Sequence, residues 1–87
     1  MEVLRIAILD FCRRRRSNSF CPSEVVRQMY PVDWRYFMKD IQLVMMEMYQ
    51  EGLIVVTQKG LPIDPNNLPS GPVRITCPKQ PKSLKKS

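Results

Sequence analysis

The sequence predicts a small α+β domain in which three helices precede an antiparallel β-hairpin. Apolar residues recur at helical spacing in three separate segments, a run of β-forming residues follows the third segment directly, and a second such run occurs near the C-terminus. The 87 residues suffice for one domain with a modest core, which we expect over residues 1–77. Because a short link joins the second and third helices, these elements predict a winged helix-turn-helix with the hairpin as its wing.

The longest helix is expected over residues 34–51. Asp33 precedes it as the expected N-cap, and Gly52 follows it where helices often end in a left-handed residue. Its predicted buried stripe consists of Trp34, Phe37, Met38, Ile41, Val44, Met45 and Met48.

The first helix is expected over residues 2–14 and the second over residues 22–30. Proline is tolerated at the first helical position, so Pro22 marks the start of the second helix, and Glu24 lies in the first turn, where acidic residues are favoured. The apolar residues that predict the two buried faces are Val3, Leu4, Ala7, Ile8, Phe11 and Cys12 in the first helix and Val25, Val26 and Met29 in the second.

Two runs of β-formers, residues 53–58 and 73–77, are expected to pair antiparallel, and residues 19–20 are a candidate for a short third strand. The segment 58–72 is rich in glycine and proline and is expected to be the irregular loop of the wing. Residues 78–87 contain one leucine among lysine, proline, serine and glutamine, which predicts a mobile basic tail that does not contribute to folding.

The cysteines are expected to be reduced. Cys12, Cys21 and Cys77 are an odd number without CxxC spacing, and the chain has no histidine, so the sequence predicts neither a disulfide framework nor a metal site. No apolar run is long enough to span a membrane and the N-terminus does not resemble a signal peptide, so we expect a cytoplasmic protein.

Catalysis finds no support in the sequence. Without histidine or a glycine-rich phosphate loop, no nucleophile and base can be paired, so we expect neither an enzyme nor a cofactor. Cys21, at a helix N-terminus, has two interpretations: an activated nucleophile, or the N-cap and core residue that we favour.

The charge is concentrated at the two ends of the chain. The net charge is +6, of which residues 1–16 carry +3 and residues 79–87 carry +4, whereas residues 17–78 carry −1. Such basic ends favour an anionic partner, with DNA as the leading candidate. The run Arg13, Arg14, Arg15 and Arg16 closes the first helix, so it is equally an anion-binding patch or a solvated helix cap.

The outer face of the third helix carries the predicted nucleic-acid contacts. Arg35, Tyr36 and Lys39 lie near its N-terminus, where a recognition helix contacts phosphates and base edges. Leu43 and Met46 share this face and suggest instead a protein contact or a homodimer. Three carboxylates of the same helix, which would repel phosphate, also argue against nucleic acid; they are Asp40, Glu47 and Glu51.

The predicted wing adds further contacts. Gln58 and Lys59 stand at its start, and Arg74 lies on the returning strand. Alternatively, Lys59 protects a sheet edge from aggregation, and Asp64 pairs with Arg74 across the base of the loop.

Several separate motifs within residues 3–77 also carry a family resemblance. They are Cys21-Pro22-Ser23-Glu24-Val25, Asp33-Trp34-Arg35, Gly52-Leu53-Ile54, Val56-Thr57-Gln58-Lys59-Gly60, and the segment from Asp64-Pro65 to Gly71-Pro72-Val73-Arg74. Together they resemble a family of small bacterial proteins classed as domain of unknown function 3253. The resemblance implies a winged-helix-like fold and no particular activity, and the basic tail lies outside it.

Overall fold

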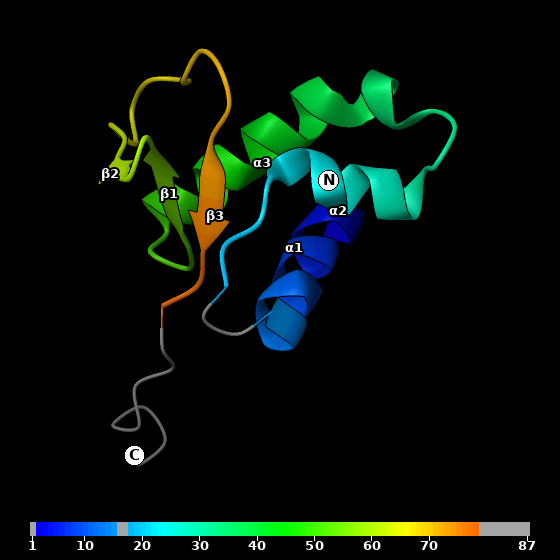
Figure 1. Cartoon of the computed structure of the whole chain (residues 1–87), viewed down its shortest axis with the longest axis horizontal. Helices are drawn as coiled ribbons and strands as arrows, with labels where there is room; N and C mark the ends of the chain where they lie inside the picture. The colour runs from blue at the N-terminus through cyan, green and yellow to red at the C-terminus, as the bar shows by residue number, and fades with distance from the viewer. Residues whose placement is uncertain (1, 16–17, 79–87) are drawn as a thin grey trace.

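Three α-helices pack together, and a small antiparallel sheet lies at the C-terminal end of the third (Figure 1). The computed structural model describes residues 2–15 and 18–78, so Arg16 and the predicted tail from residue 79 onward lie outside the described residues. The elements in chain order are α1 (Glu2–Arg15), α2 (Pro22–Met29), the 3₁₀ helix η1 (Trp34–Phe37), α3 (Met38–Gln50), β1 (Val55–Gln58), β2 (Leu61–Pro62) and β3 (Arg74–Thr76). This is the α+β architecture that the sequence predicts.

The core lies between the inner faces of the three helices and the sheet. Ile41, Val44, Met45 and Met48 of the predicted α3 stripe are buried, whereas its N-terminal members, in and beside η1, are half-buried. Val3 was expected in the buried face of α1 but is 45% exposed. The side chains with no exposed surface are those of Leu4, Ile8, Phe20, Val25, Val26, Ile41, Met45, Met48, Val56 and Ile75.

The third helix begins differently from the prediction. Its first four residues form η1, and the α-helix starts only at Met38. The Asp33 side chain makes no capping hydrogen bond, and its carbonyl instead accepts a bond of 2.9 Å from the N–H of Tyr36. This i to i+3 bond is the 3₁₀ pattern, which tightens the first turn.

The end of α3 agrees with the prediction. Gly52 has a φ of +82°, and the N–H groups of Gly52 and Leu53 donate bonds of 3.0 Å to the carbonyls of Tyr49 and Met48. This pair of bonds is a Schellman motif, which satisfies the last carbonyls of the helix. The chain therefore leaves α3 at a fixed angle and enters β1 at Val55, three residues after Gly52.

The sheet has the order β2-β1-β3. Phe20 joins its β3 edge through an isolated bridge to Ile75, with backbone bonds of 3.0 and 2.7 Å, so residues 19–20 contribute a single bridge and not the short strand considered for them. β1 pairs with β3 as expected, although both strands are shorter than predicted.

The strand β2 was not expected, because residues 58–72 were predicted to be irregular throughout. Lys59 and Gly60 both have positive φ, +55° and +83°, and form a two-residue turn that pairs Gln58 with Leu61. Positive φ at both positions is the type I′ geometry, which matches the twist of the flanking strands. A strand of only two residues leaves no pattern that alternation could reveal.

Two of the three cysteines contradict the expectation of reduced thiols. Cys12 of α1 and Cys77, directly after β3, form a disulfide with Cα atoms 5.6 Å apart. The bond joins residues 65 positions apart, and so attaches the first helix to the last strand. Cys21 is free and half-buried, and it is the N-cap residue of α2, as expected.

Glu24 joins the C-terminus of α1 to the N-terminus of α2. One carboxylate oxygen accepts a bond of 3.0 Å from the backbone N–H of Cys21, and the other accepts a bond of 2.6 Å from the Arg15 guanidinium. The backbone N–H, assisted by Arg15, holds the pKa of the Glu24 carboxyl below its usual value, although burial opposes the shift.

Glu24 should therefore make folding stability depend on pH. Because its pKa is lower in the folded state, its contribution is complete above the unfolded value of about 4.3 and is lost as the pH falls through the folded pKa. Glu24→Gln keeps an acceptor for Cys21 but removes the charge. We expect the variant to be less stable than wild type at pH 7, with a difference that shrinks as the pH falls below about 4. Urea unfolding of both proteins between pH 7 and the acidic range measures this stability difference. A difference that stays constant with pH would contradict the role given to the Glu24 charge.

Candidate nucleic-acid interface

The turn between α2 and α3 gathers two arginine side chains around one aromatic ring, and Lys39 follows in the first turn of α3. The guanidinium carbon of Arg27 lies 4.3 Å from the centre of the Trp34 ring, and that of Arg35 lies 4.6 Å from it. Both distances are within the range of a cation–π contact, so the indole limits the freedom of both guanidinium groups. We call the group Arg27, Trp34, Arg35, Tyr36 and Lys39 the corner.

The turn that carries the corner is itself held by aromatic stacking. Tyr30 at the end of α2 stacks on Phe37 of η1, with ring centres 4.1 Å apart and planes 18° apart. This contact packs the end of α2 against η1. The corner therefore has a rigid base, while its polar atoms lie at the surface.

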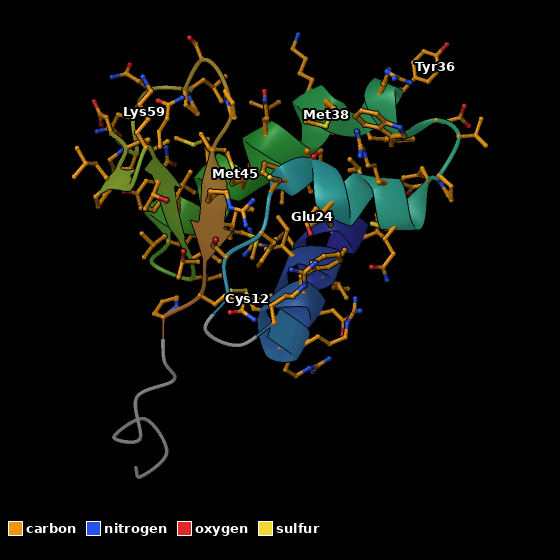
Figure 2. All side chains as sticks on the ribbon, in the orientation of Figure 1. Cys12, Glu24, Tyr36, Met38, Met45 and Lys59 are labelled. Carbon is orange, nitrogen blue, oxygen red and sulfur yellow. A yellow bond between two sulfur atoms is a disulfide. The ribbon has the colours of Figure 1, made fainter. Side chains whose placement is uncertain are left out.

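The charged groups of the corner are available for a ligand. Arg27, Arg35 and Lys39 are exposed, and within the described part of the chain none of them lies within ion-pair distance of a carboxylate. Tyr36 is 82% exposed and projects away from the body of the molecule (Figure 2). The neighbouring Asp33 and Asp40 leave the corner region with only a small positive excess.

The acidic end of α3 is compensated by α1. Arg5 contacts Glu51 at 2.6 Å and Glu47 at 3.8 Å. The hydrogen bond from Arg5 holds the pKa of the Glu51 carboxyl below its usual value, so the carboxyl stays charged and paired at neutral pH. The repulsion expected between these two carboxylates and phosphate is thereby reduced. The repulsion expected from Asp40, at the other end of the helix, is not reduced by this contact.

The two residues predicted at the start of the wing have different roles: Gln58 makes contacts within the fold, and Lys59 is exposed. The side-chain amide of Gln58 donates bonds of 2.6 Å to the carbonyl of Ser70 and 3.3 Å to that of Pro72, so Gln58 holds the loop after β2. Lys59 at the β1–β2 turn is exposed, and Figure 2 shows it and Tyr36 at opposite ends of the long dimension of the molecule. Of these two residues, only Lys59 is a candidate for a ligand contact, and it lies apart from the corner (Figure 2).

Arg74 also acts within the fold. It donates bonds of 3.1 and 3.0 Å to the hydroxyl and carbonyl oxygens of Ser19, and a bond of 3.2 Å to the sulfur of Cys21. The expected pair between Asp64 and Arg74 does not form, because Asp64 instead accepts bonds from Asn66 and Asn67. We leave Arg74 out of the candidate interface, since all three of its guanidinium nitrogens already donate a bond within the fold.

The arginine run of α1 lies on another side of the molecule. Arg13 and Arg14 each contact Asp10 at 3.0 Å, and Arg15 contacts Glu24 at 2.6 Å. Figure 2 shows Cys12, in the last turns of α1, on the opposite side from Tyr36 and Lys59. The three arginines are thus held in ion pairs at the end of α1 and do not continue the corner.

The two residues predicted for a protein contact have different environments. Leu43 is 47% exposed, but Met46 is only 6% exposed, so the prediction that Met46 lies on the outer face is wrong. The loop after β2 folds back over this turn of α3, where Gln50 donates a bond of 2.7 Å to the carbonyl of Pro65. A shallow groove of about 280 Å³ remains between helix and loop, lined by Leu43, Met46, Glu47, Gln50, Pro65, Asn66 and Leu68.

Two residues of the corner were not predicted as functional. Trp34 was assigned to the buried stripe, and Arg27 belongs to a different helix, so periodicity within one helix could not bring them together.

Within residues 2–15 and 18–78, no group of three histidine, cysteine or acidic residues is arranged to hold a metal ion. No helix of this described part is both long and apolar enough to cross a bilayer.

Comparison with known protein families gives a match over most of the chain. The model described as "Protein of unknown function (DUF3253)" matches residues 1–78, which include every described element. No curated protein matches the chain.

Proposed function

The chain belongs to the DUF3253 family, whose description gives no activity. From the surface of the chain we propose that it is a non-catalytic winged-helix protein that binds nucleic acid, specifically DNA, through the corner. The observation that carries this proposal is a set of three basic side chains beside an exposed tyrosine, unpaired within the described residues: Arg27 of α2, and Arg35 and Lys39 at the start of the third helix. We further propose a role in regulating transcription.

The order of the elements supports the proposal. A short turn joins α2 to η1 and α3, and α3 leads into an antiparallel sheet whose β3 edge is completed by Phe20. In helix-turn-helix proteins the second helix of the corner enters the major groove, and its N-terminal residues contact the bases. Trp34, Arg35, Tyr36 and Lys39 occupy that N-terminal part, and Arg27 reaches the same place from α2 through its contact with Trp34.

The chemistry of the corner suits a nucleic acid. An arginine can donate two parallel bonds to a phosphate or to a guanine edge, and Lys39 can contact a phosphate as a point charge. Because Trp34 already restricts the two guanidinium groups, less side-chain entropy is lost when they bind. Tyr36 offers a flat ring and a hydroxyl to a base or a sugar.

The proposed partner also bears on location. We propose DNA as the partner and the cytoplasm as the location. Disulfides, however, persist mainly in oxidising compartments. The Cys12–Cys77 bond therefore argues against a reducing compartment, whereas the proposed DNA partner favours the cytoplasm.

Neutralising the corner should weaken binding strongly. We expect Arg27→Gln, Arg35→Gln and Lys39→Gln together to lower the affinity of the full chain for a random-sequence duplex roughly 100-fold or more at 0.1 M salt, because three phosphate contacts are lost. Fluorescence anisotropy with a labelled duplex measures the affinity, and the thermal midpoint of each variant checks that it folds.

The matched control removes the same number of charges from the other side of the molecule. Arg13→Gln, Arg14→Gln and Arg15→Gln should lower the affinity much less, because these arginines are held by Asp10 and Glu24. Equal losses in the two triple variants would show that only total charge matters, which would contradict a binding site at the corner.

The groove beside Leu43 favours a second candidate, a protein-interaction module. Leu43 and Leu68 are 47% and 53% exposed at this groove, which could receive an apolar side chain of a partner. Selection from a random duplex pool discriminates between the two candidates. An enriched sequence whose binding survives Leu43→Glu supports the nucleic-acid function, whereas no enrichment puts the protein partner first.

A further inference from the structure

The outer side of α1 carries apolar residues that no described part of the chain covers. Val3, Ile6 and Leu9 are 45%, 60% and 44% exposed, while the opposite side of the helix buries Leu4 and Ile8 completely. Large exposed apolar side chains aligned on one helix are typical of a contact surface.

The sequence of this side is self-complementary. Glu2, Ile6, Leu9 and Arg13 follow one another at intervals of four, three and four residues, so they lie along one stripe and the spacing is the same in both directions. We call these four residues the outer stripe. It has an acidic end, two apolar positions and a basic end.

From this pattern we propose that the chain forms a homodimer in which two α1 helices pack antiparallel through the outer stripe. Ile6 of one copy then lies against Leu9 of the other, and Glu2 of each copy approaches Arg13 of the other. A two-fold contact must use the same patch on both copies, and the outer stripe meets that condition. A parallel arrangement would place Glu2 beside Glu2 and Arg13 beside Arg13, so charge selects the antiparallel one.

The existing contacts of the outer stripe permit this arrangement. Arg13 contacts Asp10 in the monomer, but Asp10 is also held by Arg14 at 3.0 Å, so it keeps a partner when Arg13 turns to the other copy. Glu2 is exposed and forms no ion pair within the described residues.

The contact is small and should be reversible. One 14-residue helix on each side offers less than the roughly 1,200 Å² that stable interfaces bury, so we expect dissociation in the micromolar range or weaker. This inference rests on α1 alone and does not depend on the proposed function. If both hold, a dimer would present two corners to one duplex, as helix-turn-helix dimers do.

Exchanging the charges tests the orientation directly. Glu2→Arg alone places an introduced arginine against Arg13 at both ends of the homodimer, and Arg13→Glu alone places two carboxylates together in the same way. We expect each variant to sediment as a monomer of about 10.2 kDa from roughly 10 µM to 1 mM, where wild type approaches twice that mass. An equimolar mixture of the two variants restores an opposite-charge pair at each end, so it should sediment like wild type.

Further variants separate this surface from others. Ile6→Glu should abolish dimerisation, whereas Leu61→Glu, at a residue of β2 that is 70% exposed, should leave it unchanged. Circular dichroism of every variant checks that the helices are intact. The proposal is overturned if wild type remains a monomer at 1 mM, if Ile6→Glu still dimerises, or if the mixture stays monomeric.

Discussion

Breaking the Cys12–Cys77 disulfide should lower the free energy of unfolding by about 4 kcal/mol, as expected for a crosslink between residues 65 positions apart. The bond limits the conformations of the unfolded chain, and it attaches α1 to the end of the sheet. Because small domains are stable by only about 5–15 kcal/mol, the reduced protein should be close to its stability limit. Guanidinium unfolding of Cys12→Ser with Cys77→Ser, compared with wild type, measures the loss.

Cys21→Ser provides the control for this experiment. Its hydroxyl can still accept the bond from Arg74, and Cys21 takes no part in the disulfide, so we expect a change below about 1 kcal/mol. A reducing agent should shift the unfolding midpoint of wild type but not that of the double serine variant. If reduction leaves wild type unchanged, the crosslink makes no contribution and this account of stability is wrong.

Phe20→Ala should cost about 3–5 kcal/mol, the usual loss for a large aromatic side chain removed from a core. Phe20 has no exposed surface, and its ring lies 5.2 Å from that of Phe11 in α1. Its backbone is fixed by two bonds to Ile75, so the site cannot easily collapse to fill the cavity. Thermal and urea unfolding of the variant measure the loss.

A matched substitution at the surface separates burial from hydrophobicity. Leu61→Ala removes apolar atoms from a residue that is 70% exposed, so its effect should stay within about 0.5 kcal/mol. A loss below about 1 kcal/mol in Phe20→Ala would mean that Phe20 does not join α1 to the sheet as described.

The helices could be predicted from the sequence because their signals are local. α2 starts at Pro22 as predicted, and both α1 and α2 end within one residue of the predicted positions. The signals used, a proline at the first helical position and the loss of helical periodicity, act over only a few residues. The stop at Gly52 was predictable for the same reason. The 3₁₀ start of the third helix was not, because the apolar spacing of residues 34–38 fits either helix type.

Features that depend on distant segments could not be predicted. The pairing of Cys12 with Cys77 requires α1 and β3 to meet, and the burial of Met46 requires the loop after β2 to cover α3. Helical geometry correctly placed Met46 beside Leu43, but it could not show which of them the loop covers. The same holds for the candidate site, where Arg35, Tyr36 and Lys39 were predicted and Arg27 was not.

The salt dependence of DNA binding tests the corner most directly. Each phosphate contact contributes about −0.9 to the slope of log affinity against log salt. Wild type and the triple variant Arg27→Gln, Arg35→Gln and Lys39→Gln, titrated as full chains on one duplex, should therefore differ in slope by about 2.7. The triple variant at Arg13, Arg14 and Arg15 should differ from wild type by less than about 1. Identical slopes for wild type and the corner variant would contradict the proposal that the corner binds nucleic acid.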